Sequence, residues 1–231
     1  MEAINKVCFR VYGRYALFSD PITRVGGEKS SYPVPTYQAL KGIAESVYWK
    51  PTFTWIIDRV KILSPIDMES KNIKNLKYND GTSDLSIYSY LINPDYLVET
   101  HLIWNENRRD LSADRDYKKH LSIMLRSIDK GGRRDIFLGT RECQGYVEPA
   151  VFDEVESPYS GKTMTFGTMV HGLTYPDESK DGRSFELRLW NPQMKDGIIN
   201  FPSPNECKIT IPVRNYEYKK FTPGINFTIS E

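Results

Sequence analysis

The sequence predicts an α+β fold whose helices are confined to the first two thirds of the chain. Segments of alternating apolar residues, which are typical of strands, occur throughout, whereas only two segments have apolar residues at helical spacing. After about residue 150, strand-like segments alternate with Gly, Pro and Asn turns, and no helical pattern remains. The 231 residues are enough to bury a core without disulfide or metal support.

The first predicted elements are a strand around residues 7–12 and a helix within "PTYQALKGIAESVYWKP". In the strand, apolar residues alternate with cysteine or polar residues. The apolar stripe of the helix consists of Leu40, Ile43, Ala44 and Val47. Pro51 disfavours helical geometry at Lys50, so the helix is predicted to end near Trp49.

The middle of the chain predicts two strands, an insertion and a second helix. "TFTWIIDRVKIL" and "YLVETHLIWN" have the composition or alternation of strands. Residues 64–95 between them are polar and contain Asn-Asp-Gly, which predicts an inserted hairpin or a mobile loop. The second helix has an apolar stripe made of Tyr117, Leu121, Met124, Leu125 and Ile128. Gly131 and Gly132 are predicted to end it.

A fourth strand within "DIFLGTRECQGYVEPAVFDEV" completes the order β-α-β-β-α-β. This is the order of the ferredoxin-like (RRM-like) fold, an open antiparallel sheet with two helices on its back. We therefore predict a ferredoxin-like domain over residues 1–149 and a smaller antiparallel all-β domain over residues 150–231. The strands of the second domain are predicted at "RSFELRLW", "GIINF", "CKITIPV" and "INFTIS".

Composition excludes several classes of protein. With 13% aromatic and 39% hydrophobic residues the chain reads as folded, and no apolar run approaches the roughly 18 residues that span a bilayer. The N-terminus lacks the apolar core of a signal peptide, so we expect a cytoplasmic protein without a membrane partner. Cys8, Cys143 and Cys207 are far apart and form no C-x-x-C motif, which supports neither a disulfide framework nor a zinc site.

The net charge of +1 means that any site for a polyanion must be a local patch. The densest cluster of cations surrounds Gly131 and Gly132 and consists of Arg126, Lys130, Arg133 and Arg134. It is either a helix end with solvated arginines or a phosphate-binding turn, in which backbone N–H groups approach phosphates and arginines pair with them. Because no Walker, dinucleotide, H-E-x-x-H or G-x-S-x-G motif is present, we predict neither a metal nor a cofactor.

His120 is a candidate proton carrier, because an unperturbed histidine titrates near pH 6.5. On a helical wheel it falls at the border between the apolar stripe and solvent, where most histidines are ordinary packed or surface residues. Lys119 points nearly opposite the stripe. The two can share a site only in the first turn of the helix, with Asp114 or Asp116 as N-cap.

Four blocks closely resemble CRISPR-associated family-five proteins of subtype I-C, the Dvulg type of the RAMP superfamily. They are "YALFSDPITRVGGEKSSYPVPTYQALKGIAESVYWKPTF", "GGRRDIFLGTRECQGYVEP", "GTMVHGLTYPDE" and "LRLWNP". The resemblance implies a ferredoxin-like RNA-binding protein that cuts precursor CRISPR RNA at the base of the repeat hairpin. It also implies that the protein then stays on the mature RNA, with other subunits of the antiviral interference complex. The family's catalytic tyrosine, lysine and histidine correspond to Tyr48, Lys119 and His120, with Lys118 as an alternative to Lys119.

These residue types suit RNA cleavage without a metal, because the 2′-OH beside the scissile phosphate can act as the nucleophile. His120 would move a proton, Lys119 would offset charge on the phosphoryl oxygens, and Tyr48 would donate a hydrogen bond. We expect a 2′,3′-cyclic phosphate and a 5′-OH. The RNA-binding residues are predicted to be Arg126, Lys130, Gly131, Gly132, Arg133 and Arg134. The alternative is a non-catalytic subunit that grips the 5′ handle of the RNA, and double-stranded DNA is a further candidate partner.

Overall fold

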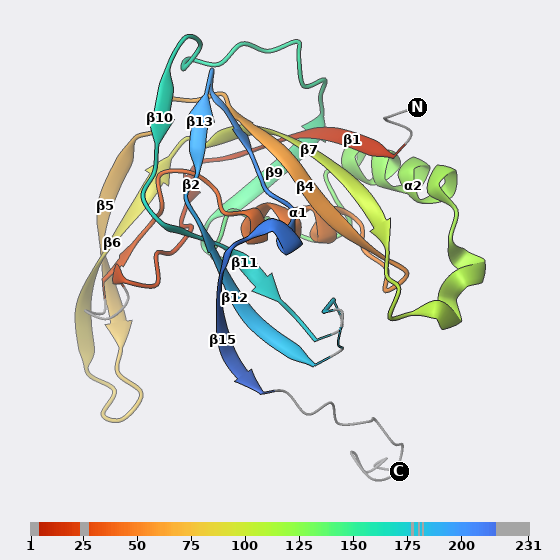
Figure 1. Cartoon of the computed structure of the whole chain (residues 1–231). Coiled ribbons are helices and arrows are strands. Elements are labelled where there is room, and N and C mark those ends of the chain that lie inside the picture. Colours follow the sequence, from red (N-terminus) through yellow and green to blue (C-terminus); the bar gives the residue numbers. More distant parts are fainter. Residues whose placement is uncertain (1–4, 24–27, 177, 180, 182, 216–231) are drawn as a thin grey trace.

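The computed structural model describes residues 5–23, 28–176, 178–179, 181 and 183–215 of the chain. The fold is α+β, with mostly antiparallel sheets and few helices (Figure 1). Its main sheet has the strand order β10-β13-β14-β4-β7-β1-β9-β8. The four central strands are β4 (Phe53–Ile62), β7 (Asp95–Trp104), β1 (Lys6–Gly13) and β9 (Gln144–Pro149). The short outer strands are β10 (Thr163–Thr165), β13 (Gln193–Lys195), β14 (Ile198–Asn200) and β8 (Ile136–Phe137).

The two predicted helices pack against this sheet. Helix α1 (Tyr37–Val47) contacts β4 and β8, and α2 (Tyr117–Asp129) contacts β1 and β9. In α1 the whole predicted apolar stripe is buried, and the helix ends at Val47, slightly before the predicted end. None of the described helices is long and apolar enough to cross a bilayer.

The buried face of α2 differs from the predicted one. The buried residues are His120, Met124, Ser127 and Ile128, whereas the predicted stripe residue Leu125 is 50% exposed. The reason is that two polar residues, His120 and Ser127, face the sheet and have hydrogen-bond partners there or within the helix. Hydrophobicity alone therefore placed the centre of the stripe too far toward Leu125.

The segment between β4 and β7 is a long hairpin rather than a loop. Its strands β5 (Met68–Leu76) and β6 (Ser83–Ile92) pair antiparallel, and β6 also pairs with β2 (Tyr15–Ala16) and β3 (Lys29–Ser30). The hairpin and α2 lie at opposite sides of the molecule in Figure 1.

The predicted fourth strand is divided into β8 and β9, which pair with each other. Between them the backbone turns at Gly139, whose φ is +96° and where a Cβ atom would lie 2.1 Å from the Leu17 oxygen. No other residue fits at this close approach, so the turn is fixed in the sequence by a glycine.

The chain after Pro149 contributes to two sheets. Strands β10, β13 and β14 extend the main sheet beyond β4, and a short 3₁₀ helix, η3 (Pro204–Glu206), follows β14. A separate three-stranded sheet, below the main sheet in Figure 1, consists of β11 (Met169–Thr174), β12 (Ser184–Trp190) and β15 (Ile209–Asn215). The predicted strand "INFTIS", residues 225–230, lies outside the described residues. The division into domains at residue 150 stays a prediction.

Candidate active site

Tyr48 is held at the C-terminal end of α1, where it is the C-cap residue with extended backbone, φ −160° and ψ 126°. Its carbonyl oxygen accepts a hydrogen bond from Trp55 Nε1 at 2.7 Å, which fixes the cap to β4. The residue is only 1% exposed, and its ring packs against Phe53 with centroids 5.5 Å apart. Burial raises the pKa of the Tyr48 hydroxyl, and the nearby Arg133 opposes that change. Tyr48 is therefore a neutral hydrogen-bond donor at neutral pH.

His120 lies in the first turn of α2 and is completely buried, so the prediction that it sits at the border of the apolar stripe is wrong. Its Nδ1 is 2.8 Å from the Tyr48 hydroxyl, and its Nε2 is 2.8 Å from the carbonyl oxygen of Asp114. A carbonyl oxygen can only accept, so Nε2 carries the hydrogen, and in the neutral ring Nδ1 accepts from Tyr48. The contact joins the C-terminal end of α1 to the first turn of α2.

Apolar rings enclose the rest of the imidazole. Its centroid lies 4.9 Å from that of Phe53 and 5.9 Å from that of Trp104. The pair of Tyr48 and His120 is thus separated from solvent by packing on the sheet side and by the protein chain at both ends.

Asp114 connects the remaining groups. It ends the 3₁₀ helix η2 (Arg109–Asp114), and its carboxylate accepts from Lys119 Nζ at 2.6 Å and from Thr52 Oγ1 at 2.9 Å. Lys50 Nζ lies 3.4 Å from the same carboxylate. The Lys119 ammonium above all, then the Thr52 hydroxyl and Lys50, hold the pKa of the Asp114 carboxyl well below its usual range. Asp114 is therefore an anion throughout the physiological pH range.

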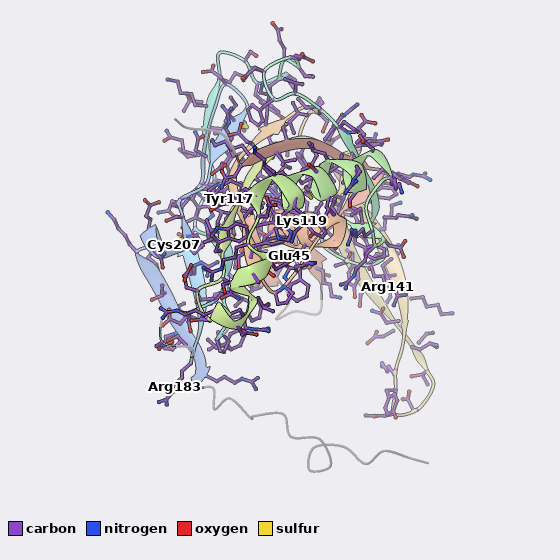
Figure 2. All side chains as sticks on the ribbon, turned by 90° about the vertical axis from the view of Figure 1, so that its right-hand side faces the viewer. Glu45, Tyr117, Lys119, Arg141, Arg183 and Cys207 are labelled. Atoms are coloured by element: carbon purple, nitrogen blue, oxygen red, sulfur yellow. The ribbon has the colours of Figure 1, made fainter. Side chains whose placement is uncertain are left out.

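Lys119 reaches the site through Asp114 and does not touch the ring of His120. Its side chain is 40% exposed, and Nζ donates to both the carbonyl oxygen and the carboxylate of Asp114. Figure 2 shows Lys119 on the face of the molecule that carries α2. Asp116 is the N-cap of α2 and accepts from the Lys119 amide, which places Lys119 and His120 in the first turn. The predicted alternative, Lys118, is exposed and takes no part in this network of described contacts.

The Gly131-Gly132 turn ties the C-terminal ends of both helices together. The amides of Gly131 and Gly132 donate to the Ile128 and Ser127 carbonyls of α2 at 2.8 and 2.7 Å. Those of Arg133 and Arg134 donate to the Val47 and Ser46 carbonyls of α1 at 3.3 and 3.2 Å. All four amides thus have partners within the protein, so of the two alternatives the backbone of this turn forms a helix end.

The side chains of the turn remain available for an anion. Arg126, Lys130, Arg133 and Arg134 are exposed, and within the described residues none of them pairs with a carboxylate. The Arg133 guanidinium lies over the Tyr48 ring, 4.6 Å from its centroid. One exposed cation therefore covers the tyrosine of the buried pair, and the amide network of the turn holds it there.

Asp114 is the site residue that the sequence prediction missed. Two aspartates occur in "SADRDYKKH", and either could have been the N-cap. Only one can cap a helix, so the other had to have a different partner, and this was the available signal. In the described part of the chain, no three His, Cys, Asp or Glu side chains gather into a possible metal site.

Comparison with known proteins gives concordant matches. The Cas5d model of the family described as CRISPR-associated protein (Cas_Cas5) matches residues 7–202. A protein named CRISPR pre-crRNA endoribonuclease Cas5d, from Thermus thermophilus, is 28% identical over 178 residues, which are 73% of this chain and 73% of the relative. A Mannheimia succiniciproducens protein of the same name is 23% identical over 228 residues, with 86% of this chain and 95% of the relative covered. A solved structure described as a CRISPR-associated protein superposes with a TM-score of 0.72 at 39% identity, over 89% of this chain and 96% of the other.

Proposed function

We propose that this chain, which belongs to the Cas5d branch of the CRISPR-associated protein family Cas_Cas5, is an endoribonuclease that cleaves precursor CRISPR RNA without a metal ion. The observation that carries the proposal is the buried hydrogen bond between Tyr48 and His120, beside exposed cations. The names of the two Cas5d relatives support the choice of substrate.

The scaffold we propose for this activity is the ferredoxin-like core. The central strand order β4-β7-β1-β9 supports it, with α1 after β1 in the chain and α2 before β9. In this arrangement the end of α1 and the start of α2 meet over the end of the sheet. Two residues that are 72 positions apart thereby come into contact.

Cleavage proceeds by attack of the 2′ oxygen on the adjacent phosphorus. The P–O5′ bond breaks, and the leaving 5′ oxygen takes up a proton from solvent, which gives a 2′,3′-cyclic phosphate and a 5′-OH. His120 is buried and reaches the RNA through Tyr48, whose oxygen takes the 2′ proton while passing its own proton to Nδ1 of His120. Lys119 and the exposed arginines offset the charge that develops on the phosphoryl oxygens.

Arg133 controls the access of RNA to the Tyr48 hydroxyl. An RNA phosphate that pairs with its guanidinium draws that group off the Tyr48 ring and uncovers the hydroxyl. Arg126, Lys130 and Arg134 hold the neighbouring phosphates, whereas Gly131 and Gly132 act through the shape of the turn. After cleavage the protein stays on the 5′ handle in the cytoplasm, together with other subunits of the interference complex, which presents the RNA to double-stranded DNA.

A second function is favoured by the complete burial of Tyr48 and His120: a subunit that grips the 5′ handle without cutting it. In this case the Tyr48–His120 bond only ties the two helices together.

A single cleavage assay, analysed on a gel, distinguishes the two functions. The cognate repeat hairpin is incubated with the protein in EDTA, in parallel with a hairpin that has a single 2′-deoxy nucleotide at the cleavage position. The proposal expects cutting of the first substrate in EDTA and none of the second. Binding without cutting of either, with or without magnesium, would establish the non-catalytic function. Cutting of the deoxy substrate would show that water is the nucleophile.

A further inference from the structure

We infer that Asp114 is a positioning residue of the Tyr48–His120 pair, which its carbonyl oxygen and its carboxylate set up for proton transfer. The inference rests on the proposed function and adds to it the group that decides which nitrogen of His120 can take a proton.

The carbonyl oxygen of Asp114 fixes the tautomer. With its hydrogen on Nε2, bonded to that oxygen at 2.8 Å, the imidazole presents an unprotonated Nδ1 to Tyr48. If the hydrogen were on Nδ1, the Tyr48 hydroxyl oxygen would accept from it, and a proton could not move from Tyr48 to the ring. A neutral histidine has no strong preference of its own, so an acceptor at Nε2 has to set it.

The side chain of Asp114 holds that carbonyl in place. Its carboxylate accepts from Thr52 Oγ1, and Thr52 is itself 2% exposed and joined to the sheet, because its carbonyl oxygen accepts from the Asn105 amide at 2.9 Å. The end of η2 is thus attached to the sheet beside β4. Without this attachment the 3₁₀ helix, which has no buried residue, has little else to hold its last carbonyl over His120.

The carboxylate also offsets charge. Its Oδ2 lies 3.5 Å from Nε2 of His120, so it stabilises the imidazolium that forms when Nδ1 takes a proton. The other groups that face the ring are Tyr48 from α1 and the apolar rings of Phe53 and Trp104. The cations around the site lie one contact further away.

Those cations are placed by the same carboxylate and by Tyr48. Lys119 and Lys50 are both paired with Asp114, and Arg133 stacks on Tyr48. The carbonyl oxygen of Asp114 therefore holds the base in its working tautomer, while its carboxylate offsets the positive form and keeps two lysines beside the site.

Asp114→Asn in the full chain tests this assignment, with Asp116→Asn as the matched control. Both substitutions remove one negative charge and change shape little, and asparagine caps a helix as well as aspartate does. Single-turnover cleavage of the repeat hairpin is measured for each variant. We expect Asp114→Asn to lower the rate by about 10–100-fold, because the positive charge that forms on the ring has lost its neighbouring anion. Asp116→Asn should keep the rate within about twofold.

Thr52→Val separates placement from charge. It removes the anchor of the carboxylate and keeps the carboxylate itself, so the fall in rate that we expect comes from placement alone. If Asp114→Asn leaves the rate unchanged, or lowers only thermal stability, the assignment is overturned.

A direct measurement keeps the assignment separate from the proposed function. Imidazole ¹⁵N shifts of His120 report which nitrogen carries the hydrogen, whether or not the protein cuts RNA. A wild-type protein that does not cut would end the proposed function, whereas a hydrogen found on Nδ1 would end the assignment of Asp114.

Discussion

His120 shows that a polar side chain can be part of a core when all of its polar atoms have hydrogen-bond partners. Both of its ring nitrogens have partners, so complete burial leaves no polar atom of the side chain unsatisfied. Its burial could not be read from hydrophobic spacing, which treats histidine as a border residue. The partner that makes its burial possible, Tyr48, is 72 positions away in the sequence.

Tyr48→Phe tests the proposed proton transfer from the RNA through Tyr48 to His120, which we call the proton relay, while leaving the packing intact. It removes only the hydroxyl, so the single-turnover rate should fall by about 10²–10⁴-fold, and hairpin affinity should stay within a few fold of the wild type. The change leaves Nδ1 of His120 buried without a donor, which lowers the free energy of unfolding by about 1–3 kcal/mol. Rates are measured well below the melting temperature of the variant.

Tyr37→Phe is the matched control for this experiment. Tyr37 is likewise 1% exposed and on α1, but its ring stacks on His171, with centroids 4.3 Å apart, rather than on His120. The loss of its hydroxyl should not slow cleavage. If Tyr48→Phe cuts as fast as the wild type, the tyrosine is a structural tie and no part of the relay.

The turn after α2 couples the two helices. Two glycines with positive φ, Gly131 at +79° and Gly132 at +102°, end α2. The next two backbone amides of the turn then donate hydrogen bonds to carbonyl oxygens at the end of α1. The sequence predicted the helix end from the glycines but gave no sign that the next two amides belong to another helix. That contact depends on the packing of both helices on the sheet, which local sequence does not encode.

Replacing both arginines of this turn by alanine tests the proposed phosphate contacts. Because the amides of the turn are already used within the protein, Arg133 and Arg134 can act on RNA only through their side chains. Arg133→Ala with Arg134→Ala should weaken hairpin binding and flatten the slope of log affinity against log salt by about 0.7–0.9 for each phosphate that the variant no longer binds. Fluorescence anisotropy over a range of salt concentrations gives the slope.

Lys195→Ala with Lys208→Ala removes the same charge from exposed positions elsewhere and should leave the slope unchanged. A slope that stays the same in the arginine variant would place the RNA backbone on another surface, such as the open face of the sheet or the β5–β6 hairpin.

A helix or strand could be predicted from the sequence where a single local pattern of apolar residues determines its structure. The stripe of α1 and the alternation of β1 predicted these two elements well, because their apolar residues all face one layer. Strands β10 and β13 have only three residues each and were marked by no local pattern, whereas β14, which pairs with β4, lies within the predicted strand "GIINF". The hairpin was predicted only as one of two possibilities, since β5 and the first half of β6 are largely exposed.

Described residues on both sides of the predicted domain boundary share one buried cluster. Met169, Met194, Ile199 and Phe201 belong to the same cluster as Phe9 and the buried residues of α1. The ring of Phe201 lies 5.8 Å from that of Tyr37, across the predicted domain boundary. A division of the sequence by composition therefore does not imply two independent cores.

Calorimetry of the full chain should accordingly give one cooperative transition, with calorimetric and van't Hoff enthalpies that agree. A fragment of residues 1–149 should fail to give a folded far-UV and near-UV spectrum, because it would expose the edge of β4 and the apolar residues that β14 covers. Two resolved transitions, or a folded fragment, would instead support two autonomous domains.

The distance along the chain between Tyr48 and His120 has a consequence for synthesis on the ribosome. Helix α1 leaves the exit tunnel long before α2, and the central position of β1 is completed only when β9 has emerged to pair with it. The proposed contact between the two residues therefore cannot become part of a completed sheet until residue 149 is available. During this interval Tyr48 and His120 belong to separate stretches of unfinished protein, so the proposed proton transfer cannot operate in a nascent chain.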